Sequence, residues 1–73
     1  MSTPEPQRWL DEHGNALYSF AMLHLRDQHC AEDAVQESLL AAIQAWPQFR
    51  GGCTVRSWLI GILKHKILDV FRR

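Results

Sequence analysis

The stretch that decides the fold is AEDAVQESLLAAIQAWPQFRGG, residues 31–52. Its apolar residues recur every three or four positions, which is the spacing of one face of an α-helix. One side of that helix would carry Ala34, Val35, Ser38, Leu39, Ala42, Ile43 and Trp46. Pro47 discourages continuation because proline has no N–H to donate, and two glycines follow. The pattern therefore predicts a helix from about Cys30 to Trp46, and then a flexible loop.

Helical patterns lie on both sides of this stretch. From Gln7 to about Arg26 apolar side chains repeat at helical spacing, and Gly14 is a weak point where this helix could bend or begin late. Asp27 is a suitable N-cap for the central helix. Thr54 is a suitable N-cap for a last helix that continues to the end of the chain.

The chain has 73 residues, which is enough for one domain at most. We predict an all-α fold, a compact three-helix domain over residues 7–73 with no sheet, after a flexible tail at residues 1–6. No run approaches the roughly 20 apolar residues of a membrane span, and the start lacks the features of a secretory signal. We therefore expect a cytoplasmic protein without membrane insertion, whose two cysteines stay reduced.

The net charge of zero hides a division of charge along the chain. Residues 1–49 carry seven acidic and two basic side chains, a net charge of −5, whereas residues 50–73 carry six basic and one acidic, a net charge of +5. Such a division favours two different partners, or one polyanion at the basic end. The alternative is that the two halves neutralise each other within the fold.

Catalytic, metal and cofactor sites find little support in the sequence. The loop RGGCTV lacks the Gly-Lys-Ser/Thr of a phosphate-binding loop. Cys53 and His65 are a thiol and a base, but their separation says nothing about proximity. His24, His29 and Cys30 do not have the paired spacing of structural zinc ligands. We predict no catalytic residue, no metal ligand and no cofactor.

The outward face of the central helix carries an unexpected leucine. Asp33, Gln36 and Glu37 lie on this face and are ordinary solvated residues when considered alone. Leu40 lies among them, and an apolar anchor inside a polar rim is the anatomy of a protein interface. Both interpretations, a solvated face and a protein interface, remain open at this point.

The basic segment is a candidate nucleic-acid interface. Arg50 and Arg56 flank a loop whose glycines let backbone approach a ligand closely, and cations that contact phosphate hold a strand in place. The polar side of the last helix adds further cations. The alternative is a basic helix that simply solvates its outer face. Trp58 could stack on a base, but it lies on the apolar stripe with Ile62, so we predict that it belongs to the core.

Four short motifs resemble a known family. They are Ala31-Glu32-Asp33-x-x-Gln36-Glu37, Phe49-Arg50-Gly51, Ser57-Trp58-Leu59 and Asp69-x-x-Arg72-Arg73. In this order and spacing they resemble conserved region 2 of the bacterial extracytoplasmic-function (ECF) sigma factors, and the resemblance covers about residues 9–73. Region 2 is a helical, non-enzymatic domain.

The resemblance implies two binding functions. The second helix would bind the β′ clamp helices of core RNA polymerase through Asp33, Gln36, Glu37 and Leu40. The loop and last helix would capture the non-template strand of the promoter −10 element and hold one flipped base while the duplex melts. The implied DNA-binding residues are Arg50, Gly51, Gly52, Cys53, Thr54, Arg56, Ser57, Lys64, His65, Arg72 and Arg73.

This sequence departs from the family pattern in two places. Gly52 and Cys53 stand where the family usually has a small hydroxyl residue, which puts the identity of the accepted base in question. The family also carries a helix-turn-helix domain that reads the −35 element, and we expect this chain, which ends without it, to bind promoters poorly alone. An anti-sigma factor is a further expected partner. The competing function is a helical protein-interaction module that binds no nucleic acid.

Overall fold

The computed structural model describes residues 3–72 and contains three long helices. They are α1 (Pro6–Leu25), α2 (Gln28–Ala45) and α3 (Val55–Arg72), with a short 3₁₀ helix, η1 (Trp46–Gln48), after α2. The predicted all-α, three-helix architecture is confirmed, and residues 3–72 contain no strand.

The helix boundaries differ slightly from those predicted. α1 begins one residue before the predicted domain boundary, at Pro6, and continues through Gly14 without a break. α2 begins at Gln28 because Asp27 caps it, and the Asp27 Oδ1 accepts the Cys30 N–H at 2.9 Å. Trp46 belongs to η1 and not to α2, since the chain tightens as it reaches Pro47.

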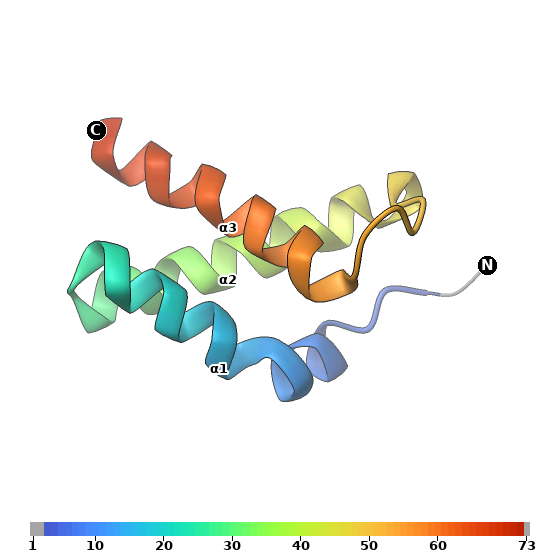
Figure 1. Cartoon of the computed structure of the whole chain (residues 1–73), viewed down its shortest axis with the longest axis horizontal. Coiled ribbons are helices and arrows are strands. Elements are labelled where there is room, and N and C mark those ends of the chain that lie inside the picture. The colour runs from blue at the N-terminus through green and yellow to red at the C-terminus, as the bar shows by residue number, and fades with distance from the viewer. Residues whose placement is uncertain (1–2, 73) are drawn as a thin grey trace.

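The three helices lie side by side along the long axis of the molecule (Figure 1). α1 and α3 run in the same direction, and α2 runs opposite to both. The loop between η1 and α3 therefore lies at the end where α1 begins, whereas α3 ends beside the turn from α1 to α2. In that turn Arg26 adopts a left-handed φ of 55° and its N–H donates to the Met22 carbonyl at 2.9 Å.

The core is formed by leucines of two helices packed on small residues of the third. Leu17 of α1 and Leu59 and Leu63 of α3 are fully buried. The buried face of α2 is mostly small and consists of Ala31, Ala34, Val35, Ser38 and Ala42. Small side chains let neighbouring helices approach closely, so α2 can contact both α1 and α3.

None of the helices described by the structure is both long and apolar enough to cross a membrane.

Candidate nucleic-acid and protein interfaces

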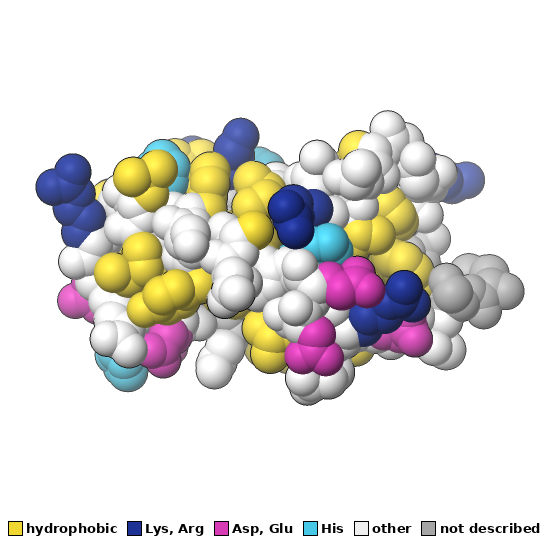
Figure 2. Space-filling view, turned by 60° about the horizontal axis from the view of Figure 1, so that its bottom comes forward, with side chains coloured by type: hydrophobic (Ala, Val, Ile, Leu, Met, Phe, Trp, Pro, Cys, Tyr) yellow, Lys and Arg dark blue, Asp and Glu magenta, His cyan; other side chains and the backbone are white. Residues whose placement is uncertain are grey.

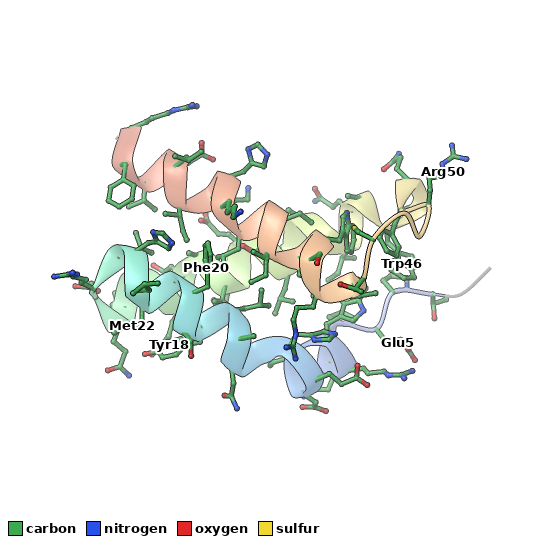
Figure 3. The ribbon with its side chains drawn as sticks, viewed as in Figure 1. Glu5, Tyr18, Phe20, Met22, Trp46 and Arg50 are labelled. Carbon is green, nitrogen blue, oxygen red and sulfur yellow. The ribbon has the colours of Figure 1, made fainter. Side chains whose placement is uncertain are left out.

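The loop between η1 and α3 stands clear of the helices. Arg50, Gly51, Gly52, Cys53 and Thr54 are all exposed. Gly51 has a φ of 76°, which favours glycine, and open space surrounds the position a Cβ would take at either glycine. Figure 3 shows Arg50 pointing outward from this end of the molecule. The loop backbone is accessible to a ligand on its outer side.

An aromatic cluster supports both ends of the loop. Phe49 stacks on Trp46 at 5.4 Å between ring centroids and contacts Trp58 at 4.7 Å. Trp9 of α1 lies 5.3 Å from Trp46 and 5.8 Å from Trp58. Trp58 is half-buried within this cluster, in agreement with its predicted place on the apolar stripe. The cluster fixes where the loop leaves and rejoins the helices.

The hydroxyl groups that follow the loop are engaged in capping α3. The Ser57 N–H donates to Thr54 Oγ1 at 3.1 Å, and the Thr54 hydroxyl donates to Ser57 Oγ at 3.1 Å. Thr54 therefore acts as the predicted N-cap. To contact DNA, these two side chains would have to do so while they keep the hydrogen bonds that cap α3.

Arg56 is held against α1. Its Nε donates to His13 Nδ1 at 3.2 Å, and its Nη2 donates to the Glu12 carbonyl at 3.4 Å. His13 and Glu12 could not be predicted as partners of Arg56, because they lie 43 and 44 residues from it and no local pattern links them. Arg56 is nonetheless exposed, so its guanidinium is still accessible from solvent.

The basic side chains in the second half of α3 are separate from those that flank the loop. Lys64 and Arg72 are exposed, as is His65, and all three lie in the second half of α3, which runs away from the loop (Figure 1). The ammonium of Lys64 lies 5.9 Å from the ring centroid of Phe20 in α1. Arg73, also predicted to bind DNA, lies outside the described residues. The predicted DNA-binding set therefore divides into a group at the loop and a group along α3.

The predicted polymerase face is a shallow depression on α2. Asp33, Gln36, Glu37 and Leu40 are exposed, and Leu40 retains 61% of its accessible surface. Together with Cys30 and Ala34, and with Val70 from α3, they line a depression of about 390 Å³. Val70 comes from α3, and the periodicity of that helix alone gives no sign that it reaches the α2 face.

Ion pairs within residues 3–72 do not balance the acidic part of the chain against its basic part. Within residues 3–72 the ion pairs are Arg8–Glu5 and Arg8–Glu12, at the start of α1, and the His13 ring lies 3.7 Å from the Glu12 carboxylate. The hydrogen bond from Arg8 holds the pKa of the Glu12 carboxyl below its ordinary value. In the described part of the chain no ion pair joins the basic segment to the acidic one.

The remaining titratable groups do not assemble a metal site. Among the described residues no group of three or more His, Cys, Asp or Glu side chains is placed to hold a metal ion. Cys30 and Cys53 are both exposed and free. Local desolvation, and then the Asp27 carboxylate, raise the pKa of the Cys30 thiol, which keeps it protonated at neutral pH.

Comparison with known proteins identifies the family. Residues 9–73 match the family Sigma-70 region 2. Since the match covers nearly the whole chain, the protein belongs to this family, and the resemblance inferred from the four motifs is confirmed. The family is non-catalytic, which agrees with the prediction that this domain is not an enzyme.

Three curated relatives illustrate the similarity. A probable RNA polymerase sigma factor of Haemophilus influenzae is 35% identical over 57 residues, covering 78% of this chain and 29% of the relative. ECF RNA polymerase sigma factor SigX of Bacillus subtilis is 29% identical over 63 residues, covering 86% and 32%. ECF RNA polymerase sigma factor SigC of Mycobacterium tuberculosis is 39% identical over 49 residues, covering 67% and 26%. The chain thus spans less than a third of these relatives. No solved structure matches it significantly.

Proposed function

We propose that this domain binds core RNA polymerase and captures the melted −10 element during transcription initiation in the bacterial cytoplasm. The β′ clamp helices would contact the α2 face that contains Leu40, and the non-template strand would lie on the loop between η1 and α3. The observation that carries the proposal is this loop: exposed, glycine-containing, flanked by arginines and supported by an aromatic cluster. An anti-sigma factor that covers these faces would hold the domain inactive.

The energetics of strand capture are consistent with this arrangement. Extruding a base from its stack costs a few kcal/mol, and stacking on a protein side chain returns about 1–3 kcal/mol per base. The open space around Gly51 and Gly52 leaves room for a base to lie against the backbone. Arg50 beside them is free to contact a flanking phosphate.

Titration with labelled single-stranded DNA of −10 type tests strand capture. If about four cations of residues 50–73 contact phosphate, the logarithm of the binding constant falls with log salt at a slope of about −3. Arg50→Gln should reduce this slope by about 0.7, because one phosphate contact is lost. Arg26→Gln is the matched control, since Arg26 lies in the turn from α1 to α2. A flat salt response would instead favour the competing function, a helical interaction module without nucleic-acid binding.

Leu40→Asp tests the polymerase face. The substitution should weaken binding to an isolated β′ clamp fragment by about tenfold or more, because an apolar anchor is replaced by a charge. The helical circular dichroism signal should remain, since Leu40 is 61% exposed. Leu23→Asp, at a leucine of α1 that is 70% exposed, is the control and should bind the clamp normally. Equal loss in both variants would contradict a specific α2 interface.

A further inference from the structure

A groove lies between the second halves of α1 and α3, away from the loop and from the α2 face. It has a volume of about 430 Å³ and is lined by Phe20, His24, Lys64, Ile67, Leu68 and Phe71. In Figure 1 the C-terminal end of α3 is opposite the loop. Figure 3 shows Phe20 pointing from α1 toward α3, where the groove lies.

Large apolar side chains are exposed along this groove. Phe71 retains 63% and Leu68 retains 48% of its accessible surface. Figure 2 shows hydrophobic side chains gathered at the surface of this half of the molecule. Contiguous exposed apolar patches on small domains are typical of interaction sites.

Charge indicates the kind of partner. Among the residues that the structure describes, no acidic side chain lines the groove, whereas Lys64 lines it and Arg72 follows Phe71 at its end. The ring of His24 lies 4.6 Å from that of Phe20, so polar and basic side chains, His24 and Lys64, border the apolar floor. A partner with apolar anchors and acidic flanks would complement both the apolar floor and the basic side chains of the groove.

The same features argue against DNA as the occupant. Lys64 and Arg72 were predicted to contact the promoter, but Leu68 and Phe71 lie between and beside them on α3. Phosphates gain nothing from such side chains, and a cation placed over an aromatic ring already has an attractive partner. The end of α3 is therefore better suited to a protein surface than to a nucleic-acid backbone.

We propose that this groove docks an amphipathic helix of a partner protein, with apolar side chains on one face and acidic residues on both edges. The α3 wall of the groove extends from Lys64 to Phe71, about 10 Å along the helix axis. Two turns of a partner helix match this length and supply two or three anchors at i, i+3/i+4 and i+7. The proposal does not depend on DNA or polymerase binding.

Two synthetic helical peptides test the proposal against the full 73-residue chain. Both carry leucine at i, i+3, i+4 and i+7 over about four turns, with glutamate at the other positions in one and lysine in the other. The glutamate peptide should bind, with NMR shift changes centred on Phe20, Leu68 and Phe71, and the lysine peptide should not. Lys64→Glu should reduce or reverse this preference.

Two exposed leucines give a matched pair of variants. Leu68→Ser should weaken binding of the glutamate peptide by about tenfold, because one buried leucine is lost from the interface. Leu40→Ser, at the exposed leucine of the α2 face, should leave that binding unchanged. Phe71→Ser serves as a second groove variant should Leu68→Ser lose its helical circular dichroism signal.

Three results would overturn the proposal. The first is equal binding of the two peptides, or equal loss in the Leu68 and Leu40 variants. The second is concentration-dependent self-association that Leu68→Ser abolishes, which would make the occupant a second copy of this chain. The third is loss of single-stranded DNA binding in Leu68→Ser, which would assign the groove to nucleic acid.

Discussion

Ser38 is a polar side chain in the middle of the helix-packing surface. It is fully buried, and its hydroxyl donates to the Ala34 carbonyl one turn earlier at 2.7 Å. The hydroxyl is therefore satisfied within its own helix and needs no partner on α1 or α3. Helix packing at position 38 therefore requires a small side chain.

Substitutions at Ser38 distinguish the effect of side-chain volume on stability from the effect of the hydroxyl group. Ser38→Ala should change the free energy of unfolding by no more than about 1 kcal/mol, because the Ala34 carbonyl keeps its place in the helix ladder. Ser38→Leu should destabilise by about 1–3 kcal/mol through overpacking. Urea unfolding followed by circular dichroism measures both. A larger loss for alanine than for leucine would show that the hydroxyl matters more than the volume.

Asp27 should make folding sensitive to acid. The N–H of Cys30 lowers the pKa of the Asp27 carboxyl below its ordinary value of 3.8. A lowered pKa in the folded state stabilises the fold above the unfolded pKa, and this contribution is lost as the pH falls through the folded pKa.

Asp27→Asn isolates this effect, because asparagine caps the helix equally well but does not titrate. Between pH of about 5 and 2 the midpoint of thermal unfolding should fall more steeply in the parent protein than in the variant. Identical curves would contradict a contribution of the Asp27 carboxylate. Other carboxyl groups titrate in both proteins and cancel in the comparison.

Among the elements, α1 contains an internal weak point that the fold tolerates. Gly14 lies inside the helix, and a Cβ added there would come 3.1 Å from Leu10 Cδ1. Leu10 is 43% exposed and its side chain is flexible, so it can move by the few tenths of an ångström required. The glycine is thus not demanded by packing.

Gly14→Ala should therefore stabilise the domain by about 0.5–1 kcal/mol, since alanine restricts the unfolded chain and favours the helix. The midpoint of urea unfolding should rise while the slope of the transition stays the same. A lower midpoint would mean that Leu10 cannot move away from the new methyl group.

At the scale of the whole molecule, the fold could be predicted from local sequence patterns. The contacts between helices that shape its surfaces could not. The caps at Asp27 and Thr54 and the stripe containing Leu59 and Leu63 were predictable, because each depends on residues a few positions apart. The contact of Arg56 with α1 was not, since it joins residues more than 40 positions apart. Only the packing of α1 beside α3 creates it.

The candidate interfaces also depend in part on contacts between helices, which a pattern within one helix does not predict. Helix periodicity placed Leu40 on the outer face of α2, and the structure agrees. Leu68 lies among exposed polar residues of α3, and nothing in the pattern of that helix connects it with Phe20 of α1. The groove between these helices exists only when both are present, so a sequence pattern within either helix cannot reveal it.

The aromatic cluster has a spectroscopic consequence. All three tryptophans of the chain, Trp9, Trp46 and Trp58, lie within 5.8 Å of one another by ring centroids. The tryptophan fluorescence of the domain therefore originates at the loop end alone. A change in emission would report events at that end, whereas a ligand seated beside Phe71 would leave the spectrum unaltered. Tryptophan emission can therefore distinguish binding at the loop end from binding at the groove beside Phe71.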